Sequence, residues 1–177
     1  LRAFDVDALV VIGGDGSFRG AWELCQRGFP VAGIPGTIDN DIAGTDATIG
    51  FDTAANTALE AVVRLRDTAS SHERLFIVEV MGRGSGYLAL YVGVSGGAEL
   101  VVVPEVPFDV DKICARLHYG RKRGKTHSLI VLAEGVMPAH DLAGQRDRRD
   151  LDSLPAGSGH DLRGPAPTRS ASAAGGK

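Results

Sequence analysis

Short apolar runs alternate with longer stretches of helical spacing over the first 135 residues. The runs occupy residues 8–14, 29–35, 74–81, 99–105 and 127–135. Helical spacing covers residues 17–27, 52–69, 84–95 and 109–123. Repetition of strand and helix predicts an α/β protein with a parallel sheet, and unbroken apolar runs are typical of strands covered by helices on both faces. Ligands of such sheets bind beyond the carboxyl ends of the strands, so the loops there are the candidate sites.

The longest helical stretch predicts which side chains face the core. Its apolar face comprises Ala54, Ala58, Leu59, Val62, Val63 and Leu65. After about residue 145 this patterning ends. Residues 146–177 hold few large apolar side chains and are rich in Arg, Asp, Gly, Ala, Pro and Ser, so their composition predicts a low-complexity tail that packs no core.

Charge and hydropathy narrow the classes of partner. The chain of 177 residues has 19 basic and 22 acidic residues and a net charge of −3. This balance argues against a nucleic-acid or anionic-membrane partner and favours a small ligand. No apolar run approaches the roughly 20 residues that span a bilayer, and the first residues lack the features of a signal peptide. We expect a soluble, cytoplasmic protein.

A glycine-rich loop follows the first apolar run. Gly13, Gly14, Asp15, Gly16 and Ser17 lie between a predicted strand and a predicted helix. Glycines let the backbone approach a phosphate, and the free N–H groups at a helix start attract an anion. Asp15 at the end of the strand can hold Mg²⁺, which prefers oxygen ligands. Similar loops occur in NAD kinases and lipid kinases, and a turn with Ser17 as helix N-cap would need no ligand.

Acidic residues follow the second run. In an extended segment alternate side chains share a side, which would place Thr37, Asp39 and Asp41 together. One carboxylate could then take a proton from an attacking hydroxyl while the other orients it, as in-line phosphoryl transfer requires. The alternative is an acidic turn in which Asn40 and Asp41 bond to the local backbone.

Two arginines bracket the third run, and an acid ends the last one. Arg74 begins the third run and Arg83 follows it. Guanidinium groups match phosphate oxygens in pairs, although a lone arginine is more often simply solvated. Glu134 stands at the same carboxyl edge, where a carboxylate could accept sugar hydroxyls or merely be exposed.

Eight blocks appear in one order over residues 7–135: GGDGS, PGTIDND, GTDATIGFDTA, RDTASSHER, VEVMGR, GGAE, VVPE and AEG. In order and spacing they resemble the ATP-dependent 6-phosphofructokinase family of bacterial type. The resemblance implies Rossmann-like parallel sheets in two lobes. Residues 1–50 would close the ATP-binding lobe, residues 51–145 would form the fructose 6-phosphate and effector lobe, and residues 146–177 would be the tail.

The implied reaction is transfer of a phosphoryl group from ATP to the 1-hydroxyl of fructose 6-phosphate, a step of glycolysis, with Mg²⁺ as cofactor. By resemblance Asp39 is the general base, Asp41 its supporting carboxylate and Asp15 the Mg²⁺-associated residue. The implied ATP-binding residues are Gly13, Gly14, Asp15, Gly16 and Ser17, and Gly14 also joins the catalytic set. The implied substrate contacts are Thr37, Asp39, Arg74, Met81, Gly82, Arg83 and Glu134.

The resemblance also implies assembly and regulation. Arg74 resembles an arginine that reaches the sugar 6-phosphate in a neighbouring subunit, so a homo-oligomer, a tetramer in the family, is expected. The implied effector pocket, which in bacterial members takes ADP or phosphoenolpyruvate, comprises Arg66, Glu99, Arg123 and Lys125.

The sequence departs from the family at both ends. The family's N-terminal segment, with a first glycine loop and an arginine that steadies the transferring phosphate, is absent, so we expect the chain alone to be inactive. The tail lacks the expected strand, but residues 159–168 are similar to the family block GHxQRGGxPT, which makes His160 and Arg163 candidate sugar-phosphate ligands. A partial match within unrelated sequence suggests a shifted reading frame, and coincidence is the alternative.

Three other functions would account for part of the sequence. A pyrophosphate-dependent relative would share the acceptor chemistry, but such proteins tend to carry bulky residues where this chain has Gly16 and Gly36. A lipid or NAD kinase would share GGDGS without TIDND and MGR. A non-catalytic effector-binding subunit is the third, although the carboxylates of the predicted site are all present.

Overall fold

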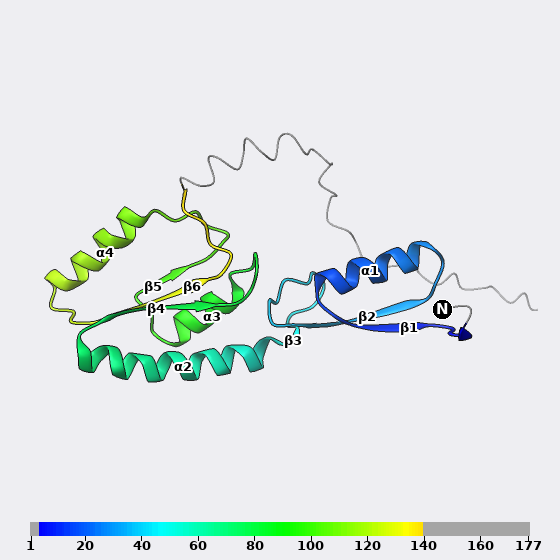
Figure 1. Ribbon diagram of the computed structural model, residues 1–177, viewed down its shortest axis with the longest axis horizontal. Coiled ribbons are helices and arrows are strands. Elements are labelled where there is room, and N and C mark those ends of the chain that lie inside the picture. Colours follow the sequence, from blue (N-terminus) through cyan, green and yellow to red (C-terminus); the bar gives the residue numbers. More distant parts are fainter. Residues whose placement is uncertain (1–3, 140–177) are drawn as a thin grey trace, which may run out of the picture.

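The computed structural model describes residues 4–139, which form two parallel three-stranded sheets flanked by helices (Figure 1). The elements in chain order are β1 (Leu9–Gly13), α1 (Asp15–Gln26), β2 (Val31–Thr37), β3 (Ile49–Gly50), α2 (Phe51–His72), β4 (Leu75–Val80), α3 (Tyr87–Ser95), β5 (Leu100–Val102), α4 (Val110–Lys122) and β6 (Ser128–Ala133). The predicted α/β class with parallel sheets is confirmed.

The first sheet has the strand order β1-β2-β3, and with α1 it forms what we call the first lobe, residues 4–50. β1 pairs with β2 from Leu9 opposite Val31 to Gly13 opposite Pro35. α1 covers one face of this sheet, where Phe18 lies close to Gly33. The opposite face exposes 61% of Val10 and 67% of Ile12. The prediction that helices cover both faces is therefore wrong for this sheet, as far as the described residues go.

The second sheet has the order β4-β6-β5, so the last strand in the sequence is the central one. Together with α2, α3 and α4 it forms the second lobe, residues 51–139. α2 and α3 pack on one face and α4 lies on the other (Figure 1). The core between them consists of Ala55, Val62, Val80, Leu88, Ala89, Val92, Leu129, Val131 and Ala133. At the β4 edge, Leu75 and Ile77 remain exposed.

α2 connects the two sheets, and it starts at Phe51 directly after β3, with no loop between them. Gly50 takes a φ of 106°, a left-handed conformation that favours glycine, at this junction. The buried residues of α2 are Ala55, Val62 and Ala69. Of the predicted apolar face, Val62 is buried, and Ala54 and Ala58 are partly buried against the core. Val63 is 43% exposed, because the buried stripe runs at seven-residue intervals on the side that faces α3 and the sheet.

Most predicted elements match the structure to within a few residues. The pattern missed β3, which has only two residues. It also began α3 too early, because residues 82–86 form a loop before the helix. No helix among residues 4–139 combines the length and the apolarity that a membrane span requires. The predicted tail, with His160 and Arg163, lies outside the described residues.

Candidate active site

The glycine-rich loop joins β1 to α1 and presents a helix start. Gly14 is the N-cap, with extended backbone and no side-chain cap, and its carbonyl accepts the first helical bond from Phe18 N at 3.0 Å. Ser17 lies inside the first turn, so the alternative with Ser17 as N-cap is wrong. The first N–H groups of a helix have no partner within it, so they can bind an anion.

Asp15 stands in the first turn of α1 and pairs with Arg19 at 2.8 Å. Both side chains are at least half exposed. An exposed ion pair of this kind contributes only about 0–1 kcal/mol, so Arg19 does not commit Asp15 to a structural role. Asp15 remains available to a ligand or a cation.

The sequence analysis predicts an extended acidic loop after β2, but in the structure this loop is a turn. The strand ends at Thr37, and the chain turns at Asn40, whose φ is 52°. Thr37 Oγ1 accepts a hydrogen bond from Asp39 N at 3.3 Å, and Asn40 Oδ1 accepts one from Thr48 N at 2.9 Å. Buried Thr48 in turn donates to the Thr37 carbonyl at 2.6 Å. These hydrogen bonds join the loop to Thr48 and hold its backbone. A turn, rather than an extended segment, therefore positions Thr37, Asp39 and Asp41.

The two loops meet at a polar pocket of about 190 Å³. It is lined by Gly14, Asp15, Gly16, Ser17, Gly36, Thr37, Asp39, Asp41 and Arg83. Every residue except Arg83 comes from the first lobe, and Arg83 follows β4 in the second. The structure therefore brings together the glycine-rich loop, both candidate carboxylates and one candidate arginine.

The surroundings of Asp39 change its acidity. Burial raises the pKa of Asp39, and so does the neighbouring Asp41 carboxylate. The Arg83 guanidinium and a hydrogen bond with the Thr37 side chain lower the pKa in part, but the net shift is upward. A carboxylate with a raised pKa is a stronger base once ionised, which suits proton abstraction from a hydroxyl.

The loop of residues 82–86, which we call the sugar loop because it carries predicted sugar-phosphate contacts, is held by its backbone. Glu134 Oε1 accepts hydrogen bonds from Gly82 N at 3.2 Å and Arg83 N at 2.7 Å. Arg83 has a φ of 50°, and Ser85 N donates to the Gly82 carbonyl at 2.8 Å. Glu134 thus shapes the loop that presents Arg83. The neighbouring Met81 is 63% exposed.

One side-chain hydrogen bond joins this loop to the first lobe. Ser85, 6% exposed, donates from Oγ to the Asp39 carbonyl at 2.7 Å. The Asp39 backbone is therefore held by a hydroxyl on each side, because Thr37 accepts from its N–H. Sequence reasoning missed Ser85.

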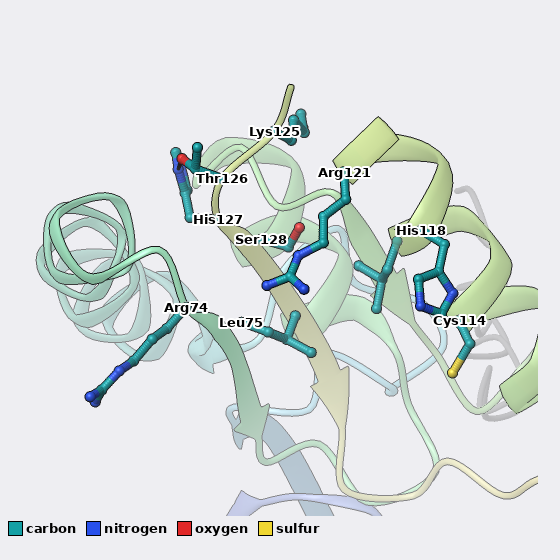
Figure 2. Close-up of a pocket in the computed structure, with 10 residues that line it drawn as sticks. Arg74, Leu75, Cys114, His118, Arg121, Lys125, Thr126, His127 and Ser128 are labelled. Carbon is teal, nitrogen blue, oxygen red and sulfur yellow. Dashed lines mark hydrogen bonds between the residues drawn. The ribbon is translucent and has the colours of Figure 1, made fainter. Parts of the chain in front are cut away.

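Arg74 lies away from this pocket. It precedes β4, whereas Arg83 follows it, and the six residues of β4 at roughly 3.3 Å each separate the ends by about 20 Å. Arg74 borders another cleft, of about 300 Å³, between α4 and the start of β4 and β6. In Figure 2 its guanidinium points away from the other lining residues. Within one chain, Arg74 and Arg83 cannot hold the same phosphate.

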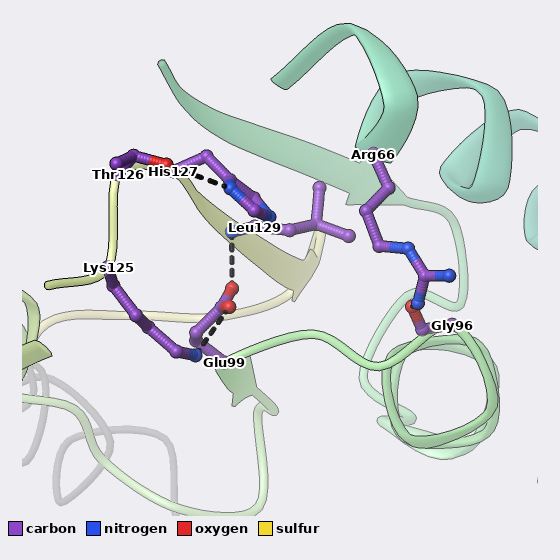
Figure 3. A network of polar contacts seen from close by, with 7 residues as sticks. All are labelled: Arg66, Gly96, Glu99, Lys125, Thr126, His127 and Leu129. Carbon is purple, nitrogen blue, oxygen red and sulfur yellow. Dashed lines mark hydrogen bonds and ion pairs between the residues drawn. The ribbon is translucent and has the colours of Figure 1, made fainter. Parts of the chain in front are cut away.

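Three of the predicted effector residues share a third cleft, of about 540 Å³, which Glu99, Arg123 and Lys125 line with Tyr119. Glu99 pairs with Lys125 at 2.8 Å and accepts from Leu129 N at 2.5 Å (Figure 3). Burial would raise the pKa of Glu99, but the Leu129 N–H and the charge and hydrogen bond of Lys125 outweigh it and lower this pKa.

The fourth predicted effector residue stands apart. Arg66 of α2 donates to the Gly96 carbonyl at 3.3 Å, on the far side of the loop after α3 (Figure 3). It does not line the cleft around Glu99. Arg66 ties α2 to the loop that leads to Glu99.

Among residues 4–139 no three His, Cys, Asp or Glu side chains gather as a metal cluster. The donors around the pocket are nevertheless carboxylates and hydroxyls. Mg²⁺ is commonly bound through one or two carboxylates together with substrate phosphates and water. This donor set fits Mg²⁺ carried in with a phosphorylated ligand.

A helix start that can bind an anion, next to two carboxylates at the end of a parallel strand, is an arrangement that suits phosphoryl transfer. The family described as Phosphofructokinase matches residues 1–175. The chain belongs to this family.

Known relatives support this membership. An ATP-dependent 6-phosphofructokinase of Natranaerobius thermophilus is 53% identical over 169 residues, and one of Listeria welshimeri is 56% identical over 169 residues. Each match covers 95% of this chain and 53% of the relative, so the chain spans about half their length. The solved phosphofructokinase of Saccharomyces cerevisiae has 36% identity and a TM-score of 0.68, over 78% of this chain and 22% of that one.

Proposed function

We propose that the protein transfers the γ-phosphoryl group of ATP to the 1-hydroxyl of fructose 6-phosphate, giving fructose 1,6-bisphosphate. The observation that carries this proposal is the shared pocket of the GGDGS loop, Asp39, Asp41 and Arg83. The names of the relatives at 53% and 56% identity support the choice of donor and acceptor. Because the chain spans about half of those relatives, the proposal concerns the protein with the further segments that they carry, called here the completed protein.

In this mechanism the phosphates of ATP lie against the N–H groups at the start of α1. Asp39 accepts the proton of the sugar 1-hydroxyl. The hydroxyl oxygen forms the new bond to the γ-phosphorus, and the bond from that phosphorus to the leaving ADP oxygen breaks. Asp41 raises the basicity of Asp39 by its charge. Asp15 would hold Mg²⁺, which supplies neutralisation of phosphate charge when bound.

Arg83 would bind the sugar phosphate, with Met81, Gly82 and Glu134 beside it. The opposite ends of β4 separate Arg74 from Arg83, which supports a second subunit whose Arg74 completes the site. We therefore propose a homo-oligomer, a tetramer as the family resemblance implies. The protein would act in the cytoplasm.

We also propose a division of labour between the lobes. Residues 1–50 would contribute to ATP binding and residues 51–145 to binding of sugar phosphate and effector. Glu99, Arg123 and Lys125 would receive ADP or phosphoenolpyruvate, since two cations in one cleft suit an anionic ligand.

The competing donor is pyrophosphate. Gly16 borders the pocket, and a Cβ added there would meet no atom within 4 Å, so the space beside it is open to a nucleotide. Gly36 is weaker support, because a Cβ there would lie 3.0 Å from Ile12 Cγ2 and strand packing alone explains the glycine.

The test is a coupled assay of the completed protein with fructose 6-phosphate and Mg²⁺, using ATP or pyrophosphate as donor. We expect turnover with ATP. Turnover with pyrophosphate alone would contradict the donor, and turnover with neither would favour the non-catalytic effector-binding alternative. In the same assay, Asp39→Asn tests the general base. Its matched control is Asp46→Asn, which removes an exposed acid after the TIDND loop.

A further inference from the structure

The sugar loop is anchored at a third point besides Glu134 and Asp39. Glu105, in the loop after β5, accepts a hydrogen bond on Oε1 from Gly86 N at 2.7 Å. Gly86 closes the sugar loop and is the N-cap of α3, because its carbonyl accepts the first helical bond, from Leu90 N at 2.8 Å. The carboxylate of Glu105 thus lies where the loop becomes a helix.

No charged side chain of α3 itself interacts with the N–H groups at the start of this helix. The helix, YLALYVGVS, contains no Asp, Glu, Lys, Arg or His, and its Gly86 N-cap lacks a side chain. A negative charge at a helix N-terminus is stabilising, and a hydrogen bond to a charged group is stronger than one between neutral groups. Glu105, in the loop after β5, supplies both the negative charge and the hydrogen bond to a charged group.

The fit around Gly86 is close. A Cβ on Gly86 would contact the other carboxylate oxygen of Glu105 and would lie 2.6 Å from Val103 Cβ. Gly86 is itself buried. Glu105 itself is exposed, so loss of the carboxylate would replace a fixed, charged partner of the Gly86 N–H by mobile water.

Two glutamates therefore hold the sugar loop from the same sheet edge. Glu134 follows β6 and fixes the start of the loop at Gly82 and Arg83, and Glu105 follows β5 and fixes its end at Gly86. Between them Ser85 donates to the Asp39 carbonyl. A shift at Gly86 would move Ser85 and Arg83, since both lie within three residues of it.

We propose that Glu105 is a positioning residue: through Gly86 it sets the sugar loop so that Arg83 can bind the phosphate of a sugar phosphate. The inference rests on the proposed function, because it takes Arg83 as a substrate contact. Glu105 does not line the pocket around Asp39, so it acts through Gly86 rather than on the substrate.

The first measurement is amide hydrogen exchange in the 177-residue chain itself. Glu105→Ala should speed exchange at Gly86, Ser85 and Arg83, whereas amides of the central strand β6 should keep their protection. Glu105→Gln should restore slow exchange, because the amide oxygen can accept from Gly86 N. The matched control is Glu60→Ala, which removes an exposed carboxylate paired with Arg64 on α2.

The second measurement is steady-state kinetics of the completed protein. Glu105→Ala should raise the KM for fructose 6-phosphate roughly tenfold, the worth of one hydrogen bond to a charged group, and leave the KM for ATP unchanged. Glu105→Gln should recover most of the loss, and Glu60→Ala should change neither constant. A purely structural role would lower the melting temperature with the KM for fructose 6-phosphate unchanged in folded protein.

Arg83→Ala separates the two ways of failing. If Arg83→Ala weakens fructose 6-phosphate binding while Glu105→Ala changes neither this KM nor the exchange at Arg83, the inference about Glu105 is overturned and the proposed function stands. If Arg83→Ala leaves fructose 6-phosphate binding intact, the proposed function is wrong at this residue, and the inference fails with it.

Discussion

The two lobes of this chain differ in how much of their apolar surface is covered. In the second lobe, helices lie on both sides of the sheet, and β6 is buried along most of its length. In the first lobe, α1 covers one face, and Ala21 is the one buried hydrophobic residue among residues 4–50. The candidate phosphate loop and carboxylates nevertheless lie almost entirely on this thinly packed lobe.

The difference separates the source of stability from the source of chemistry. Burial of apolar side chains dominates folding stability, so the second lobe should supply most of it. The chemistry of the first lobe then depends on being held by the second, and the described side-chain bond between them at the site is Ser85 to the Asp39 carbonyl. Substitutions should therefore act on rate in one lobe and on stability in the other.

The largest effect is expected from Asp39→Asn in the completed protein. Loss of a positioned general base should lower kcat by roughly 10²–10⁴, while fructose 6-phosphate still binds and the melting temperature stays close to that of the parent. Steady-state kinetics and calorimetric binding check both halves. The comparison between lobes breaks if Asp39→Asn unfolds the protein, and the assignment of the base breaks if kcat changes no more than in Asp46→Asn.

Core truncation should show the opposite pattern. Leu129 in β6 is 1% exposed, and Leu129→Ala should lower the free energy of unfolding by about 2–5 kcal/mol. Ile12 in β1 is 67% exposed, and Ile12→Ala should change the free energy of unfolding by no more than about 0.5 kcal/mol. Urea titration of the 177-residue chain followed by circular dichroism measures both. Equal costs would mean that the first lobe is covered in solution.

The open space at Gly16 permits a sharper test of the donor. Gly16→Asp places a carboxylate at the pocket without a clash, since no atom lies within 4 Å of its Cβ position. The KM for ATP should rise roughly tenfold through repulsion of phosphate charge and loss of room. Gly16→Ala adds the Cβ without charge and is the control. An unchanged KM for ATP in Gly16→Asp would remove the steric argument for a nucleotide donor.

The raised pKa of Asp39 predicts the pH dependence. A base works only when ionised, so kcat should fall as the pH drops through this pKa, at a higher pH than for an ordinary aspartate. Asp41→Asn removes a charge that raises the pKa of Asp39, so the acid limb should move to lower pH. The position of the limb in a pH profile of kcat is the measurement, with Asp46→Asn as control. A limb that stays in place would show that Asp41 does not act on Asp39.

The smallest effect is expected from Arg66→Ala. Arg66 bonds to the Gly96 carbonyl rather than lining the cleft around Glu99, so its loss should loosen the loop before Glu99. We expect a weaker response to ADP or phosphoenolpyruvate with little loss of basal rate, because effectors act by biasing conformations. Effector titrations of the rate measure this. Equal losses of basal rate and of response would place Arg66 in the catalytic machinery or the core.

Sequence patterns predicted the strands and helices well because most are long enough to show their periodicity. β3 has two residues and carries no period, so it was missed. Exposure of Val10 and Ile12 could not be read either, because an apolar residue looks the same in sequence whether or not another element covers it.

For the site, residue types were more informative than geometry. Alternation along an extended segment predicts that Asp39 and Asp41 lie together, but it is the turn at Asn40 that places them at the pocket. Ser85 was missed because a serine that bonds across lobes has no local signature. Glu105 ends an apolar run at the same sheet edge as Glu134, so the strand-end argument that indicates Glu134 also indicates Glu105.

The central position of β6 has a consequence for synthesis on the ribosome. β4 and β5 each pair with β6 and not with each other, so neither has a strand partner until residues 128–133 have left the exit tunnel. In contrast, β1 can pair with β2 as soon as residue 37 emerges. At about 5–20 residues per second, the nascent second lobe waits several seconds after β4 emerges, and during that time the apolar β4 segment is open to chaperones. The better packed lobe is thus the later one to form during translation.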